Sequence, residues 1–167
     1  MSMDLRRLLV AVDDSAAALR AVDIAVRLAA ASGAEVRFVH VTGDGTLRRA
    51  LAPGGEGALP DRVSRGVEAL LDRVAGQARE AGVPCSVRAL AGEPEAEVIA
   101  QALSWGADLV VIGRSQSGAV GRPYVGHVTR HILEFSDAPV LVVPRPRGGG
   151  VGEVVSGRSR LGAVSPA

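Results

Sequence analysis

The chain of 167 residues contains no lysine, one cysteine and very few aromatic side chains. Because all 19 basic residues are arginine, enzymes that need a Schiff-base lysine or the lysine of a P-loop are excluded. The single cysteine, Cys85, leaves no intrachain disulfide and no multi-cysteine zinc site. An aromatic content of 2% argues against a surface that binds nucleic acid by stacking bases.

Long hydrophobic runs are also missing. The first apolar run, Leu8–Val12, is too short for a signal peptide, and no segment reaches the length of a membrane span. The sequence therefore predicts a cytoplasmic protein with no membrane partner. The formal net charge of +1 gives no reason to expect nucleic acid as a partner. Residues 145–167 are rich in Gly, Ser, Pro and Arg and lack apolar periodicity, so we expect a disordered tail after a folded domain over residues 1–144.

Apolar residues make up 47% of the chain, enough for one domain with a full core. Short apolar runs predict strands, and amphipathic segments between them predict helices. The expected strands are Leu8–Val12, Ala34–Val41, Cys85–Leu90, Asp108–Ile112 and Ala138–Val143. The expected helices run from Ser15 to Gly33, from Pro60 to Gly82, from Pro94 to Gly106 and from Gly126 to Phe135. This alternation predicts an α/β fold, a doubly wound parallel sheet with helices on both faces.

The stretch Leu109–Thr129 combines a strand, a Gly- and Ser-rich loop and the start of a helix. Backbone N–H groups and a helix N-terminus in this order form a cradle for anions. No carboxylate occurs between Asp108 and Glu134, whereas five potential cations do: Arg114, Arg122, His127, Arg130 and His131. The local charge therefore favours a phosphate. The alternative is that the glycines only permit a tight surface loop.

Residues 8–41 and 110–144 resemble the universal stress protein family, and the similarity covers roughly residues 5–144. The resemblance implies a single-domain, five-stranded parallel sheet in the order 3-2-1-4-5. It also implies a homodimer joined through the last strand, Ala138–Val143.

Members of this family that bind ATP carry the loop G-x2-G-x9-G-[ST]. Gly113 and Gly126 match its first and third glycines, but Gln116 replaces the second glycine and His127 replaces the Ser or Thr. Gly118 and Thr129 are nearby substitutes for the lost groups. An acidic residue after the first strand contacts the ribose in such members, and a Val ending the second strand frames the adenine. The resemblance thus implies an adenine nucleotide such as ATP, bound weakly at these residues: Ala11, Asp13, Val41, Gly113, Gly118, Gly126, His127 and Thr129.

Other interpretations remain open. Gln116 and His127 favour a family member that has lost nucleotide binding and acts as a dimeric protein-interaction module. A slow nucleotide hydrolase is disfavoured, because no general base is expected beside the loop.

Single residues also have alternative roles. Asp13 has an alternative role as a helix-capping acid. The four-residue spacing of His127 and His131 resembles a metal site, but we expect no metal, because the remaining histidine, His40, is remote in the predicted sheet order.

Overall fold

The computed structural model describes residues 4–43, 59–114 and 126–146, with side chains from residue 64 onward in the second range. The segment 147–167 and the loop position Gly118 lie outside the described residues, so the predictions made for them stay predictions. The elements are β1 (Arg7–Ala11), α1 (Ala16–Ser32), β2 (Glu35–Thr42), α3 (Leu59–Glu80), β3 (Cys85–Ala91), α4 (Pro94–Trp105), β4 (Leu109–Gly113), α5 (His127–Phe135) and β5 (Val140–Val143).

The five strands form one parallel sheet in the order β3-β2-β1-β4-β5. This confirms the predicted α/β fold class and strand order. The central strand, β1, pairs with β2 on one side and with β4 on the other. The last strand begins at Val140 rather than at Ala138. Pro139 has no N–H to give to the sheet, although its carbonyl accepts a bond from the Val110 N–H at 2.9 Å.

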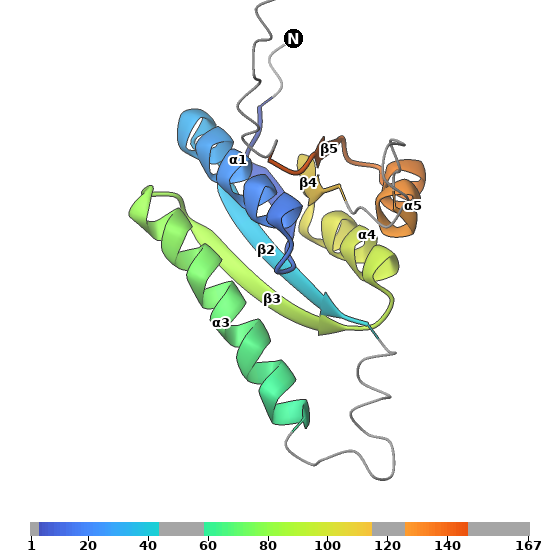
Figure 1. Ribbon diagram of the computed structural model, residues 1–167. Helices are drawn as coiled ribbons and strands as arrows, with labels where there is room; N and C mark the ends of the chain where they lie inside the picture. The colour runs from blue at the N-terminus through green and yellow to red at the C-terminus, as the bar shows by residue number, and fades with distance from the viewer. Residues whose placement is uncertain (1–3, 44–58, 115–125, 147–167) are drawn as a thin grey trace, which may run out of the picture.

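Helices cover both faces of the sheet (Figure 1). One apolar core lies between the sheet and the pair α1 and α3, and a second lies between the sheet and the pair α4 and α5. Alternate residues of each strand enter the two cores: Leu8 and Val10 of β1 face α1, whereas Leu9 faces α4. Strands buried on both faces need continuous apolar runs, which is why β1 and β4 are recognisable in the sequence.

Local signals set the ends of the helices as the sequence predicts. Ser15 caps α1, since its hydroxyl accepts a bond from the Ala18 N–H at 3.2 Å. Gly33 and Gly106 end α1 and α4 in the left-handed conformation, with φ of 73° and 67°. Pro94 begins α4, where its missing N–H is tolerated.

None of the helices in the described part of the chain is long and apolar enough to cross a membrane. After β5, the backbone is held against α1 by Arg20. Its guanidinium donates to the carbonyls of Pro144 at 3.2 Å and Arg145 at 3.0 Å. The start of the predicted tail is thus anchored to the domain.

Candidate functional site

A pocket of about 210 Å³ opens at the carboxyl ends of β1, β2 and β4, between the sheet and the N-termini of α4 and α5. In a doubly wound sheet this is where ligands bind, because the winding direction reverses between β1 and β4. Its lining is mostly apolar. The lining residues are Ala11, Val12, Asp13, Ala18, Val39, His40, Val41, Pro94, Val98, Ile112, Gly113, Val128, Thr129 and Ile132.

Five of the eight residues predicted from the sequence line this candidate pocket. They come from three strands, the turn after β1 and one helix: Ala11, Asp13, Val41, Gly113 and Thr129. The turn after β1 and the bend after β4 therefore converge, although about a hundred residues separate them in the chain. Gly126 and His127 stand just outside the lining, at the N-terminus of α5.

Asp13 is exposed at the rim of the candidate pocket and also shapes the turn before α1. Its Oδ1 accepts a hydrogen bond from the Ser15 N–H at 2.8 Å. This contact holds the chain in a turn that the Asp side chain itself stabilises. The N-cap of α1 is Ser15 and not Asp13, and the second carboxylate oxygen of Asp13 has no partner among the described residues.

Glycine is required at position 113 for a structural reason that the sequence did not reveal. A Cβ at this position would lie 2.5 Å from the backbone N of Ala18 and 2.6 Å from the carbonyl carbon of Ala17. The first turn of α1 therefore packs directly on the end of β4, and only glycine leaves room for it. This close packing places the N-terminus of α1 beside the candidate pocket, where Ala18 is part of the lining.

The start of α5 contributes Thr129, whose side chain is buried with 2% of its surface exposed. Gly126 is the N-cap of this helix, and its carbonyl accepts a bond from the Arg130 N–H at 3.0 Å. No side chain in the described part of the chain caps α5. Its first backbone N–H groups are therefore available to an anion at this end of the pocket.

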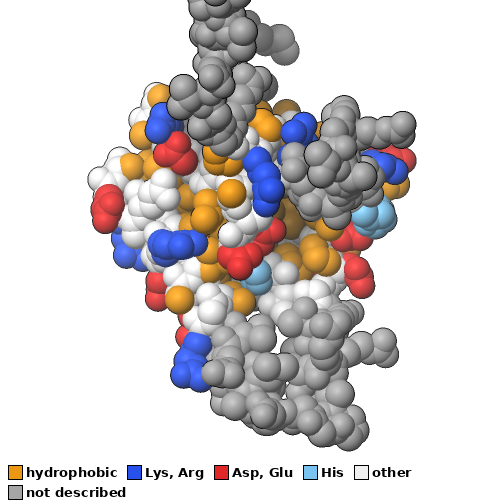
Figure 2. Space-filling view, in the orientation of Figure 1, with side chains coloured by type: hydrophobic (Ala, Val, Ile, Leu, Met, Phe, Trp, Pro, Cys, Tyr) orange, Lys and Arg blue, Asp and Glu red, His pale blue; other side chains and the backbone are white. Residues whose placement is uncertain are grey.

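The expectation of a carboxylate-free phosphate site was wrong in one respect. The Nδ1 atom of His127 lies 3.4 Å from Oε1 of Glu95, whose side chain is only 13% exposed, whereas that of His127 is 75% exposed. Counting charges along residues 108–134 missed Glu95, because it comes from the first turn of α4. That no general base lies beside the loop stays a prediction, since residues 115–125 lie outside the described residues. On the face shown in Figure 2, acidic side chains gather between α1 and α4, with histidine surface beside them.

His40 is nearer to the candidate pocket than the sequence argument assumed. Its ring Nδ1 lies 2.8 Å from the carbonyl oxygen of Val12, and His40 lines the pocket together with Val128 and Thr129. The expectation that it is remote was wrong, because β2 is the direct neighbour of β1 in the sheet. Among the residues described, no cluster of three or more His, Cys, Asp or Glu side chains could hold a metal ion.

One further feature was not predicted, and a second was predicted only as a positive charge in the sequence. The apolar wall of the pocket comes largely from Pro94 and Val98 of α4 and from Val128 and Ile132 of α5. Their helical spacing predicted burial, but not which end of the sheet they would cover. The second feature is Arg114, directly after Gly113. Its Nε atom is buried without a hydrogen-bond partner among the described residues, while its backbone N–H donates to the Val143 carbonyl at 2.7 Å.

A sequence profile of the universal stress protein family matches residues 4–144. The chain belongs to the universal stress protein family. It is 26% identical over 142 residues to a universal stress protein of Methanocaldococcus jannaschii, which covers 85% of this chain and 84% of the relative. It is also 26% identical to universal stress protein YxiE of Bacillus subtilis, over 82% of this chain and 97% of the relative.

Solved structures of the family share the fold. A family protein from Arabidopsis thaliana with AMP bound is 19% identical and superposes with a TM-score of 0.61, covering 84% of this chain and 92% of its own. The Archaeoglobus fulgidus protein in complex with dAMP is 21% identical, with a TM-score of 0.62 over 85% and 99% of the two chains. A universal stress protein in complex with cAMP is 24% identical, with a TM-score of 0.65 over 86% and 99%.

Proposed function

We propose that this universal stress protein binds an adenine nucleotide weakly in the candidate pocket and acts as a dimeric, non-catalytic sensor. The observation that carries the proposal is the convergence of Asp13, Val41 and Gly113 on one apolar pocket at the switch point of the sheet. Family proteins of the same fold have been solved with AMP, dAMP and cAMP, which supports adenine as the base.

The nucleoside half of the pocket is the better formed half. Val39, Val41 and Val98 offer apolar surface to a base, and Asp13 at the rim offers a carboxylate to ribose hydroxyls. In this role the carboxylate accepts hydrogen bonds from the sugar, which fixes the orientation of the nucleoside.

The phosphate half combines opposing charges. The N-terminus of α5 and the buried Nε of Arg114 have no side-chain cap and no hydrogen-bond partner, respectively, among the described residues, and both favour an anion. Glu95 beside His127 opposes one. With Gln116 in place of a loop glycine as well, we expect weak binding of ATP, and we leave Gly118 as a proposed substitute donor of backbone N–H groups.

Calorimetric titration of the purified chain with ATP and with AMP tests the proposal directly. We expect heat that saturates at high micromolar to millimolar ligand and disappears in Asp13→Ala. Asp14→Ala is the matched control: Asp14 is also exposed but does not line the pocket. No heat at millimolar concentrations of either nucleotide would overturn the proposal.

The second candidate function is a protein-interaction module without a nucleotide. It is favoured by Gln116 and by the contact between His127 and Glu95, since that contact occupies the ring that would otherwise face a phosphate. The double variant Gln116→Gly with His127→Ser separates the two functions. If ATP binding appears only in this variant, the parent chain is the interaction module; if the parent already binds ATP, the first function holds.

The proposed dimer uses β5. This strand lies at one edge of the sheet, and Val140, Leu141 and Val142 are half-buried apolar residues along it. An apolar edge strand offers unpaired backbone groups to a second copy. Light scattering at micromolar concentration should report the mass of a dimer, and Leu141→Arg should shift it toward the monomer. A parent chain of monomeric mass would contradict this part of the proposal.

Non-catalytic binding is tested by phosphate release from ATP. The family assignment supports a binding protein rather than an enzyme. We expect no phosphate above the buffer blank. Release that increases with protein concentration and is lost in Asp13→Ala would show a hydrolase instead, with Glu95 as the first residue to test as its general base.

A further inference from the structure

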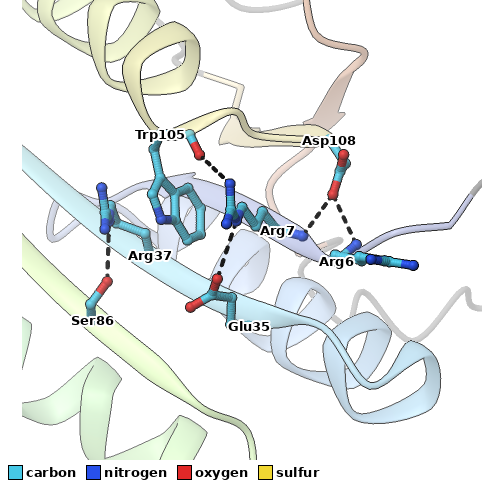
Figure 3. Close-up of polar contacts among 7 residues, drawn as sticks. All are labelled: Arg6, Arg7, Glu35, Arg37, Ser86, Trp105 and Asp108. Atoms are coloured by element: carbon cyan, nitrogen blue, oxygen red, sulfur yellow. Dashed lines mark hydrogen bonds and ion pairs between the residues drawn. The ribbon is translucent and has the colours of Figure 1, made fainter.

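The side of the sheet that carries α4 holds a second cluster of charged residues, away from the candidate pocket. Trp105, the last residue of α4 and the only tryptophan of the chain, has its ring between two guanidinium groups (Figure 3). The carbon of the Arg37 guanidinium lies 4.3 Å from the ring centroid, and that of Arg7 lies 6.0 Å from it. Both distances are within the range of cation–π attraction.

Arg88 extends this cluster onto β3. In the register of the sheet, Arg37 pairs with Ser86, and Arg88 lies two residues further along the same face. Among the described elements, α4 and α5 cover this side of the five strands, and Arg88 remains exposed. We call the surface formed by Arg7, Arg37, Arg88 and Trp105 the arginine face.

The carboxylates close to the arginine face are already engaged. Oε1 of Glu35 lies 3.3 Å from Nε of Arg7. Asp108 accepts two backbone N–H groups, from Arg6 at 2.9 Å and from Arg7 at 2.8 Å. The cluster therefore contains three arginines and one carboxylate that pairs with an arginine side chain.

Arg37 and Arg88 have no carboxylate partner among the described residues. Nε of Arg37 donates to the Ser86 hydroxyl at 3.1 Å, which leaves its two terminal nitrogens without a hydrogen-bond partner in that part of the chain. Arg88 makes one long contact, 3.4 Å to the carbonyl oxygen of Val87. Each guanidinium thus retains donors that bond to no other group of the described residues.

The electrostatic environment of Arg37 is unfavourable for a cation. Partial burial lowers the pKa of its guanidinium, and the positive charge of Arg88 lowers this pKa further. Arg7 acts in the same direction, and Glu35 opposes it. Because arginine stays protonated under these conditions, the repulsion between the guanidinium groups persists until an anion is placed among them.

We propose that the arginine face is a docking surface for an acidic segment of a partner protein. The two terminal nitrogens of Arg37 form a fork that donates two parallel hydrogen bonds to one carboxylate of that segment. Arg88 binds a second carboxylate along β3. Stacking on Trp105 and the bond to Ser86 hold the fork in one orientation. Nucleic acid fits this surface less well, because the ring of Trp105 already lies between guanidinium groups and cannot stack on a base.

A labelled peptide of alternating Glu and Ala residues is the probe, titrated against the full chain and followed by fluorescence anisotropy. Trp105 emission gives a second, local readout, because no other tryptophan contributes. We expect saturable binding that weakens with added salt and a change in Trp105 emission over the same concentration range. Arg37→Gln should weaken binding about tenfold and Arg88→Gln about threefold, as charge-assisted hydrogen bonds are lost.

Arg37→Lys separates charge from shape, because it keeps the cation but loses the fork and the bond to Ser86. We expect it to recover only part of the affinity lost in Arg37→Gln. The matched control is Arg27→Gln, which removes an exposed arginine of α1 that pairs with Asp23 at 3.1 Å; its binding should equal that of the parent chain.

Arg88 is exposed, so Arg88→Gln tests the proposal even if Arg37→Gln impairs folding. Three results would overturn the proposal: binding that neither substitution changes, equal binding of a Gln–Ala peptide, or tighter binding of a single-stranded oligonucleotide of equal charge with the same dependence on both arginines.

Discussion

The candidate pocket and the arginine face lie at different parts of one sheet, and they differ in the charged side chains that they contain. At the carboxyl ends of the strands, the candidate pocket is lined by apolar side chains, with Asp13 at its rim and Glu95 close by. On the arginine face, guanidinium groups surround a tryptophan. The arginine face thus gathers positive charge at a different part of the sheet from the pocket that is proposed to bind a nucleotide. The family resemblance alone would direct attention to the loop after β4, where several cations are close in sequence.

This difference shows why charge counted along a segment is a poor guide to charge at a site. Glu95 is more than thirty residues before His127 and yet contacts it. Arg37 and Arg88 are on separate strands and yet repel each other. Coulomb energy depends on distance in space and on burial, and the sheet register determines both.

The largest expected effect concerns the packing that forms the candidate pocket. Gly113→Ala should lower the free energy of unfolding by about 3 kcal/mol, because its Cβ would overlap the backbone of Ala18 at 2.5 Å. Urea denaturation followed by circular dichroism measures this. Gly76→Ala, within α3, is the control: its Cβ would meet nothing within 4 Å, and we expect stabilisation of about 0.5–1 kcal/mol. Equal stabilities of the two variants would mean that α1 does not constrain this end of the sheet.

The next effect concerns two carboxylates near the ends of β1: Asp108 bonds to its start, and Asp13 follows its end. Asp108→Ala should cost about 2 kcal/mol of stability, because the N–H groups of Arg6 and Arg7 lose their acceptor together. Asp13→Ala removes one such bond, to Ser15, and should cost about 1 kcal/mol. The same denaturation measurement compares them. A larger loss for Asp13 would contradict the view that Asp108 is structural whereas Asp13 is available to a ligand.

A smaller effect tests the charge balance at the candidate pocket. Glu95→Gln should tighten ATP binding about fivefold while changing adenosine binding little, because the substitution removes a partly buried negative charge near the phosphates. Calorimetry with both ligands measures it. Glu93→Gln is the control, since Glu93 is exposed and its side chain makes no capping bond. An equal gain for adenosine would place the effect of Glu95 on the base or sugar instead.

The smallest effect on stability is expected at the arginine face. Glu35→Gln breaks the ion pair between Glu35 and Arg7, whose side chains are 46% and 49% exposed, respectively. The substitution should lower the free energy of unfolding by no more than about 0.5 kcal/mol. It also removes the carboxylate partner of the Arg7 guanidinium, whose Nη1 still donates to the Trp105 carbonyl at 3.0 Å, so the Glu–Ala peptide should bind about twofold more tightly. Thermal denaturation and fluorescence anisotropy measure the two quantities. Unchanged or weaker peptide binding would show that Glu35 does not compete for this surface.

Several elements could be predicted from local residues because their signals are local. The Ser15 cap, the left-handed Gly33 and the start of α4 at Pro94 depend on side chains and dihedral angles of a few neighbouring residues. The strand ends are less certain from sequence, as β5 shows: the ladder begins only after Pro139.

The site was predictable only in part. Alternating apolar runs and helices, with the family resemblance, were enough to bring Asp13 and Gly113 to one edge of the sheet. Three features of the site were not predictable: the contact of Glu95 with His127, the contact of His40 with the Val12 carbonyl, and the close packing at Gly113. Each depends on how two elements cross in space, and no pattern within a single element records that.

The amino-acid sequence by itself determined the fold class, the order of the elements and the caps of the helices, because these follow from periodicity and from local backbone preferences. Only the tertiary structure decided where charge collects. It placed the carboxylate of Glu95 beside His127, and it placed the guanidinium groups of Arg7 and Arg37 on either side of Trp105. Electrostatic interactions act over a few ångströms of space, and the sheet brings together residues that the chain keeps far apart.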